Sequence, residues 1–384
     1  MKTVYLDNGA TSFPKPEGVS LRMKEYLDCV GATVNRSVYE SAAEAGMVLL
    51  SCRERLARLF HFEDPTHVIL TPGMTAGMNM VIKGYLRAGD HVIVSSMEHN
   101  AVMRPLVQME AQGVRFDRVP CDREGRLPVS AMRRLFRENT RLCIIAHGSN
   151  VSGTVQDAES VGRLCEEMGV PFVLDAAQTA GHIDVDFARF RLAALCVPGH
   201  KGLLGPGGIG ALLLRPDFAA ALTPLIAGGT GSASDSEELP PYMPDRFESG
   251  TPNMPGVYGL EAALRFIEEK GIPALRAHEC RLMKRFLDGA RGIEGVRLVG
   301  PTAPEERVGV YSLDFIGRDN AEVAFRLETE YGILTRCGLH CAPSAHKTLD
   351  TFPQGTVRFS TGFSTTEEKI DLALSAIAEI ARSE

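Results

Sequence analysis

The chain has 384 residues, of which 44% are hydrophobic and 23% charged, so it can bury a large core and has the length of two domains. Its formal net charge of -7 gives no general attraction to nucleic acid or anionic membranes, and we expect neither as a partner. No apolar run is long enough to cross a bilayer and no signal-peptide pattern opens the chain, so we expect a cytoplasmic protein. The nine cysteines form no disulfide framework.

Short apolar runs alternate with helical patterns along the first half of the chain. We predict helices at residues 76–86, from about residue 100 and at 161–168, and strands at 67–70, 91–94, 142–146, 171–174 and 211–214. Apolar strands spaced by helices are typical of a parallel sheet covered on both faces, in which ligands gather at the carboxyl ends of the strands. Residues that follow these strands should therefore meet at one crevice: Thr75, His99, Asn150 and Asp175.

The second half of the chain begins with a long loop and ends in a different pattern. Residues 227–256 are rich in Gly, Ser, Asp and Pro, and such a long loop indicates a functional segment or an interface. A helix at 257–270 then leads to a smaller domain. Its predicted elements are helices at 273–289 and 321–331 and strands at 308–315 and 356–360.

A lysine among glycines follows a buried strand, in the run Gly199-His200-Lys201-Gly202. A lysine amine in such a place can form a Schiff base with an aldehyde cofactor. The alternative is an exposed loop lysine, which is the usual position of this residue type.

Other predicted strand ends carry groups that suit a phosphorylated pyridine ring. Asp175 can pair with a protonated ring nitrogen, which keeps the ring able to accept electrons, and Gln178 can donate to a ring hydroxyl. His99 can stack on the ring and move protons. The alternatives are a helix N-cap for Asp175, which is compatible with the first role, and a hydrogen-bonded loop histidine for His99. The turn that holds Thr75 offers backbone N–H groups to a phosphate.

Residues 335–343 read Thr-Arg-Cys-Gly-Leu-His-Cys-Ala-Pro. A cysteine beside histidine and arginine can be held partly as the nucleophilic thiolate. The alternatives are a metal site and a pair of inert core cysteines, although the spacing matches no common zinc pattern. The groups that a metal site would use are Cys337, His340, Cys341 and His346.

Arg358 lies in a run that alternates like a strand, residues 356–360. Its planar guanidinium fits an amino-acid carboxylate, and the alternative is a plain surface salt bridge.

These segments occur together in the order typical of one group of enzymes. The chain resembles the cysteine desulfurases of the class V aminotransferase family, which are fold-type I pyridoxal 5′-phosphate (PLP) enzymes. The resemblance runs from Tyr5-Leu6-Asp7-Asn8-Gly9-Ala10-Thr11 to Val357-Arg358-Phe359-Ser360-Thr361-Gly362, and it is closest to SufS-type desulfurases and selenocysteine lyases.

The resemblance implies an α/β fold with a large PLP-binding domain and a smaller C-terminal α+β domain. The large domain, with a mostly parallel sheet covered by helices, is expected at residues 15–260. The small domain, which carries the cysteine loop, is expected at residues 1–14 and 261–384.

The resemblance also implies a role for each site residue. Lys201 would hold the cofactor and later move the α proton of the substrate, and Cys341 would take the sulfur as a persulfide. The expected cofactor-binding residues are Thr75, Ala76, His99, Asp175, Gln178, His200, Lys201 and Thr251, the last reaching the phosphate of the neighbouring subunit in a homodimer. The expected substrate-binding residues are Asn8, Asn35, Arg36, Asn150 and Arg358.

Some positions depart from the SufS-type pattern. Pro198 stands where those proteins have a serine, and Leu339 stands where they have the first histidine of a Gly-His-His-Cys run. Asn35-Arg36 replaces their His-Arg, and Gly9 replaces an alanine. We therefore expect a cysteine desulfurase, with selenocysteine lyase, class V aminotransferase and a PLP-fold scaffold as alternatives.

Two questions stay open at this stage. The sulfur acceptor is not specified, and it could serve iron–sulfur cluster assembly, RNA thio-modification or selenium delivery. A second cysteine, Cys337, suggests the hypothesis of a persulfide relay, and an inert structural thiol is the alternative.

Overall fold

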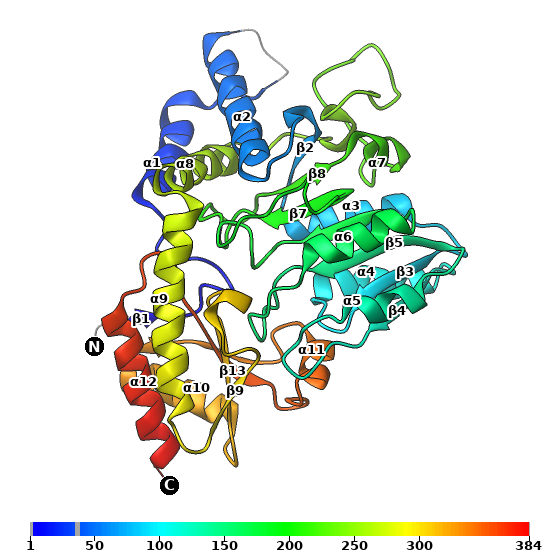
Figure 1. Ribbon diagram of the computed structural model, residues 1–384. Coiled ribbons are helices and arrows are strands. Elements are labelled where there is room, and N and C mark those ends of the chain that lie inside the picture. Colours follow the sequence, from blue (N-terminus) through cyan, green and yellow to red (C-terminus); the bar gives the residue numbers. More distant parts are fainter. Residues whose placement is uncertain (1–2, 35–38, 384) are drawn as a thin grey trace.

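A seven-stranded mixed sheet forms the centre of the protein in the computed structural model, which describes residues 3–34 and 39–383 (Figure 1). Only β8 runs antiparallel to its neighbours within this sheet, so the predicted mostly parallel sheet is confirmed. The strands in spatial order are β2 (Val68–Thr71), β8 (Gly210–Leu214), β7 (Ala194–Pro198), β6 (Phe172–Asp175), β5 (Thr140–Ala146), β3 (His91–Ser95) and β4 (Arg115–Val119).

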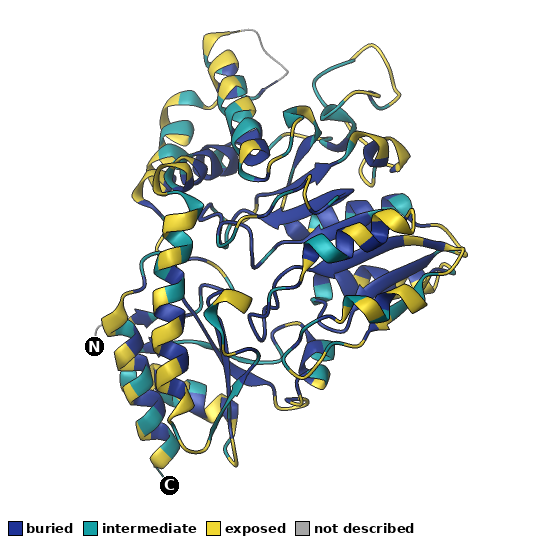
Figure 2. Cartoon of the chain, in the orientation of Figure 1, coloured by how far each residue is buried: buried dark blue, intermediate teal, exposed yellow. Residues whose placement is uncertain are grey.

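Helices cover both faces of this sheet because successive strand residues point to opposite faces and nearly all of them are apolar. In β3, Ile93 packs on one face and Val92 and Val94 on the other, and all three are fully buried. The strands of the large sheet are mostly dark blue, the colour of buried residues, in Figure 2. The first face is covered by α2 (Glu40–Leu59), α6 (Ala158–Glu167) and α8 (Met254–Lys270), and α1 (Glu17–Glu25) packs against α8 in the same core. The second packs against α3 (Met74–Tyr85), α4 (Asn100–Glu110) and α7 (Pro216–Ala221).

A second, four-stranded antiparallel sheet lies in the C-terminal part, in the order β12 (Arg336–Gly338), β13 (Thr356–Ser360), β10 (Val310–Phe315) and β9 (Val296–Val299). Its core includes the stacked rings of Phe286 and Tyr311, whose centroids are 4.4 Å apart. The accompanying helices are α9 (Ile272–Arg291), α10 (Asn320–Tyr331), α11 (Pro343–Thr348) and α12 (Glu367–Arg382).

The N-terminal segment joins the two sheets. β1 (Val4–Tyr5) pairs in parallel with β11 (Ile333–Leu334) beside the smaller sheet. The chain then crosses to the large sheet, and we call residues 7–15 the N-terminal strap. The predicted division at residues 14 and 260 stays a prediction. Within the described residues, no helix combines the length and the apolar character needed to span a membrane.

Some elements carry too weak a pattern to predict. β4 lies at the sheet edge and reads Arg-Phe-Asp-Arg-Val, so it has no apolar run. The short helix α5 (Val129–Met132), on the same side of the fold, also went unpredicted.

Candidate functional site

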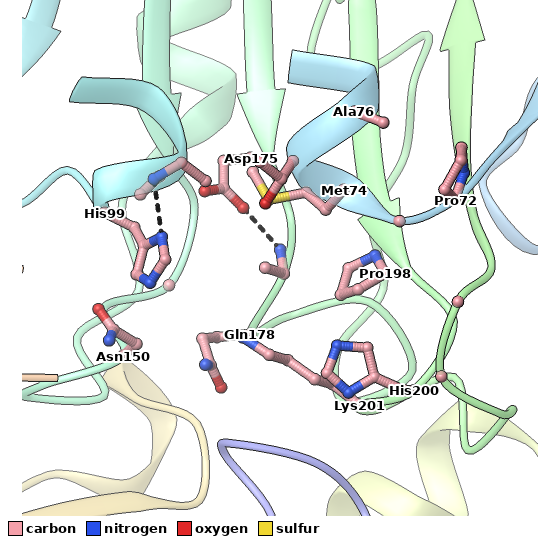
Figure 3. Close-up of a pocket in the computed structure, with 18 residues that line it drawn as sticks. Pro72, Met74, Ala76, His99, Asn150, Asp175, Gln178, Pro198, His200 and Lys201 are labelled. Atoms are coloured by element: carbon pink, nitrogen blue, oxygen red, sulfur yellow. Dashed lines mark hydrogen bonds between the residues drawn. The ribbon is translucent and has the colours of Figure 1, made fainter. Parts of the chain in front are cut away.

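A cavity of about 640 Å³ opens at the carboxyl ends of the parallel strands (Figure 3). This volume lies within the range typical of sites for small molecules and cofactors. The four residues predicted to meet at one crevice all line it, together with Gln178 from the turn after Asp175 and two residues of the lysine loop. The set is Thr75, His99, Asn150, Asp175, Gln178, His200 and Lys201.

Lys201 lies on a loop that packs closely against neighbouring backbone, and glycines at two positions make this approach possible. A side chain at Gly202 would place its Cβ 2.2 Å from the carbonyl oxygen of Ala180, and one at Gly199 would place it 2.8 Å from that of Ile209. Burial lowers the pKa of Lys201 to about 8, while Asp175 acts in the opposite direction. The amine is therefore partly neutral near physiological pH.

Asp175 ends β6 at the wall of the cavity. Its carboxylate accepts a hydrogen bond from the backbone N–H of Ala177 at 2.9 Å, and within the described residues it forms no ion pair. Burial raises its pKa to about 6. A buried carboxylate without a cation is costly, so this geometry calls for a cationic ligand group.

His99 precedes α4 and faces the same space from another strand end (Figure 3). Its Nδ1 accepts a hydrogen bond from the N–H of Ala101 at 3.0 Å, which leaves the ring proton on Nε2. Burial, helped by the charge of Lys201, lowers the pKa of His99 to about 4. The imidazole is therefore neutral and keeps one N–H donor.

The opposite end of the cavity suits an anion. The first turn of α3, with Thr75 and Ala76, opens toward it and has no side-chain cap. His200 lines the same end, and burial lowers its pKa to about 4. Gln178 donates to the carbonyl of Gly9 at 3.0 Å and lies between the two ends of the cavity (Figure 3).

Arg358 reaches the site from β13, and its side chain is 1% exposed. It donates to the carboxylate of Asp7 at 2.6 Å and to the carbonyl oxygen of Asn150 at 3.2 Å. Its Nε–H is buried with no partner in the described structure. This donor is closed off from solvent, and Arg358 is not among the residues that line the main cavity.

Cys341 is exposed and lies in a tight turn just before α11. Its carbonyl oxygen accepts from the N–H of Asn100, next to His99, at 2.8 Å, which fixes the turn beside the cavity. The guanidinium of Arg336 lies 3.6 Å from the sulfur. This cation can stabilise negative charge on the sulfur. Asn150 also holds the turn, because its amide donates to the carbonyl of His340 at 2.6 Å.

Cys337 does not share this environment. It precedes Gly338 on β12, directly after Arg336, and successive strand residues point to opposite faces. Burial raises the pKa of the Cys337 thiol, and the negative charge of Asp319, at the start of α10, raises it further by a smaller amount. The side chain thus faces α10 while Arg336 faces Cys341, so this geometry favours the structural role over the relay.

Other predicted site residues lie outside the main cavity. Asn8 lines two small cavities beside it, and its amide is used to bind the carbonyl of Ser360 and the N–H of Phe13. Thr251 is exposed and does not line the main cavity. Asn35 and Arg36 lie outside the described residues.

The described residues contain no cluster of side chains that would support the alternative of a metal site. Within residues 3–34 and 39–383, no three His, Cys, Asp or Glu side chains are grouped as metal ligands would be. His340 and His346 instead bond to the hydroxyls of Thr356 and Thr351, at 3.1 and 2.7 Å.

Three residues that support the site from outside the main cavity were not among the predicted site residues: Asp7, Lys15 and Arg336. Of these, only the arginine was already expected to favour the thiolate of the neighbouring cysteine. The sequence carries a signal for Arg336, because it lies in the same run as Cys341. In the structure it pairs in register with Arg358. The sequence carries no such signal for Asp7 and Lys15, because only the path of the N-terminal strap brings them to the site.

The sequence matches the family model for class V aminotransferases over residues 4–373. The chain belongs to the class V aminotransferase family. This confirms the resemblance drawn from the motifs, and enzymes of this family use PLP.

Relatives and solved structures agree with the family. The chain is 32% identical over 382 residues to a "Probable cysteine desulfurase" of Methanothermobacter thermautotrophicus, covering 98% of this chain and 94% of the relative. It is 31% identical to one of Pyrococcus abyssi, covering 100% and 95%.

Two solved structures support the α/β fold expected from the motifs. An apo cysteine desulfurase from Thermococcus onnurineus superposes with a TM-score of 0.93 at 30% identity, over 99% of this chain and 95% of that one. The cysteine desulfurase CsdA of Escherichia coli gives 0.87 at 27% identity, over 99% and 94%. The predicted fold class is confirmed.

The residues around the cavity fit PLP. A buried lysine amine, a buried carboxylate that lacks a cation, and an uncapped helix start match the aldehyde, the ring nitrogen and the phosphate of that cofactor. Lys201, Asp175 and the first turn of α3 all line one space of adequate size.

Proposed function

We propose that the protein is a PLP-dependent cysteine desulfurase, which converts L-cysteine to L-alanine and transfers the sulfur to Cys341. The observation that carries this proposal is the exposed thiol of Cys341 beside a cavity that contains the buried amine of Lys201. An aminotransferase would have no use for a thiol at this position. The relatives from Methanothermobacter and Pyrococcus, both named as probable cysteine desulfurases, support the same reaction.

The residues that would hold the cofactor surround the cavity. Lys201 would form the covalent link, Asp175 would pair with the ring nitrogen, and His99 would lie against the ring. The phosphate would bind at the first turn of α3, with Thr75 and His200. When bound, PLP supplies an electron-accepting ring that stabilises the charge left on the substrate α-carbon after a proton is removed.

Substrate binding is assigned to the side that Arg358 reaches. The positive charge and planar shape of its guanidinium suit the α-carboxylate of an amino acid. Asp7 orients the guanidinium from the other side at 2.6 Å. Asn150 holds both Arg358, through its carbonyl, and the cysteine turn, through its amide. The substrate would therefore lie between the lysine and the thiol.

Proton transfer is assigned to two groups. Lys201, with its pKa lowered to about 8 by burial, can remove a proton from the α-carbon when neutral and return it when charged. His99 keeps its proton on Nε2 and can donate a hydrogen bond into the cavity.

Sulfur transfer follows from the position of Cys341. Its thiolate attacks the substrate sulfur and forms a new S–S bond, while the Cβ–S bond breaks and its electron pair passes to the substrate carbons. Protonation of those carbons completes alanine, and Cys341 is left as a persulfide. A thiol reductant or an acceptor protein must then remove the outer sulfur. Arg336, 3.6 Å from the sulfur, stabilises the attacking thiolate.

The assembly and the sulfur acceptor are part of the same proposal. We infer a homodimer in which Thr251 of each chain reaches the phosphate site of the other. Thr251 is exposed and does not line the main cavity of its own chain, which supports this inference. A sulfur-acceptor protein would approach the exposed face of Cys341.

The decisive experiment compares Cys341→Ala with the control Cys29→Ala. Cys29 is also exposed, and it does not line the main cavity. Alanine and sulfide are measured with L-cysteine and L-selenocysteine, in the presence of dithiothreitol, alongside the PLP absorbance. We expect Cys341→Ala to keep the absorbance and to lose at least about 100-fold of cysteine turnover, because a covalent step is removed.

Cys29→Ala should behave like the wild type. Unchanged cysteine turnover in Cys341→Ala would contradict the sulfur-transfer assignment. Selenocysteine turnover far above cysteine turnover in the wild type would instead identify a selenocysteine lyase, and conversion of PLP to its amine form would identify an aminotransferase.

A further inference from the structure

The N-terminal strap contacts the site at several points. The carbonyl of Gly9 accepts from Gln178 at 3.0 Å, and the carboxylate of Asp7 binds Arg358. The strap passes along the open side of Lys201 and Gln178 in Figure 3. It thus contacts groups from both the large sheet and the smaller sheet.

The densest contact is on a single carbonyl group. The oxygen of His200 accepts from the N–H of Ser12 at 2.9 Å and from its hydroxyl at 3.1 Å. It also accepts from the hydroxyl of Thr11 at 3.1 Å and from the Nζ of Lys15 at 2.9 Å. A carbonyl oxygen has two lone pairs, so four donors make this acceptor unusually crowded. The only charged donor among them is Lys15.

Lys15 is placed there at an energetic cost. It is half-buried, and within the described residues it forms no ion pair, since its second partner is the hydroxyl of Ser12 at 2.7 Å. Burial lowers its pKa to about 8. Lysines rarely give up hydration without a carboxylate partner, so this arrangement requires a reason.

The position of that carbonyl supplies the reason. It belongs to the peptide bond that joins His200 to Lys201, the residues assigned to the phosphate and to the covalent link. A charge-assisted hydrogen bond to this peptide fixes the backbone from which both side chains start. Without it, the two side chains would lose a shared anchor.

We propose that Lys15 is a positioning residue of the active site, which clamps the His200–Lys201 peptide bond and thereby holds both side chains in the cavity. This inference rests on the proposed use of Lys201 and His200 as cofactor-binding residues. Lys15 itself does not line the main cavity. It acts through the backbone and contacts no reacting atom.

The test uses Lys15→Met, Lys15→Arg as the conservative rescue, and Lys24→Met as the control. Lys24 is an exposed lysine on α1 that pairs with Asp28. The first measurement is amide hydrogen exchange in the cofactor-free full chain, over peptides that cover residues 199–205 and, for comparison, 140–146. We expect Lys15→Met to raise exchange in the first peptide alone, and Lys15→Arg to restore most of the protection.

The second measurement is a spectrophotometric titration with PLP. Loss of a charge-assisted hydrogen bond should weaken PLP binding roughly tenfold in Lys15→Met, with a smaller effect in Lys15→Arg and none in Lys24→Met. Unchanged exchange at 199–205 would overturn the proposal, as would an equal rise at 140–146, which indicates a general loss of stability. If the wild type bound no PLP, the proposed function would fail, while the exchange experiment would still decide on the clamp.

Discussion

Lys201 and Asp175 share one buried cavity, and burial acts on their pKa values in opposite directions. It lowers that of the lysine to about 8 and raises that of the carboxyl to about 6. Both values move toward neutral pH, where a group that gives and takes protons is most effective. Each group also stabilises the charge of the other, so neither value is independent of its neighbour.

This coupling predicts the pH dependence of cofactor uptake. Only the neutral amine of Lys201 attacks an aldehyde, so the rate of PLP uptake by the cofactor-free protein should rise with pH, with a midpoint near 8. Asp175→Asn removes a negative charge that raises the pKa of Lys201, and the midpoint should move to lower pH. Stopped-flow absorbance after mixing with PLP measures both. A midpoint that moves upward in Asp175→Asn would contradict the assigned coupling.

At the scale of elements, the site depends on loops that buried ion pairs hold against the sheet. Arg53 on α2 pairs with Glu248, at the end of the long loop, with nitrogen–oxygen distances of 2.6 and 2.7 Å. The same carboxylate accepts from the N–H of Leu70 in β2 at 2.6 Å. Helix, loop and strand are thus tied at one point, close in sequence to Thr251.

Removing one partner of this pair should be far more damaging than removing a surface pair. Arg53→Met leaves the carboxylate of Glu248 buried without a cation, and we expect the free energy of unfolding to fall by about 3–5 kcal/mol. Arg58→Met, which breaks an exposed pair with Glu268, should cost less than about 1 kcal/mol. Urea unfolding followed by circular dichroism measures both.

The double variant Arg53→Met/Glu248→Gln should recover part of the loss, because the remaining group is uncharged. Equal losses of unfolding free energy in the two single arginine variants would show that the buried pair contributes no more to stability than the exposed pair.

At the scale of the whole molecule, the two sheets contribute different parts of one site. The large sheet brings Lys201 and Asp175, whereas the smaller sheet brings Arg358 and the cysteine turn. The N-terminal strap connects them. In the proposed homodimer, the partner subunit completes the site through its Thr251.

Subunit mixing tests that arrangement. Lys201→Ala and Thr251→Asp should each be inactive as homodimers, the second because its charge repels the phosphate. In a mixed dimer, one site contains both variants and the other contains neither. Unfolding and refolding an equimolar mixture should therefore restore about a quarter of the wild-type sites. Light scattering confirms the dimer. No recovered activity in mixed dimers would place Thr251 in its own chain's site, and an active Thr251→Asp homodimer would place it in no site.

The amino-acid sequence by itself determined the apolar strands, their spacing by helices and hence the sheet covered on both faces. It also predicted that Thr75, His99, Asn150 and Asp175 meet at one crevice, and all four line the main cavity, because residues after parallel strands share one edge of the sheet. These features follow from local patterns. The family followed from motifs in a fixed order.

Only the tertiary structure decided which distant residues support the site. The contacts of Asp7 with Arg358 and of Lys15 with the backbone of His200 join segments at opposite ends or far apart in the chain. The opposite orientations of Arg336 and Cys337 depend on how β12 pairs with β13. Periodicity reports which residues face a core, but the path of the loops decides which side chains meet, and that path is fixed by packing of the whole molecule.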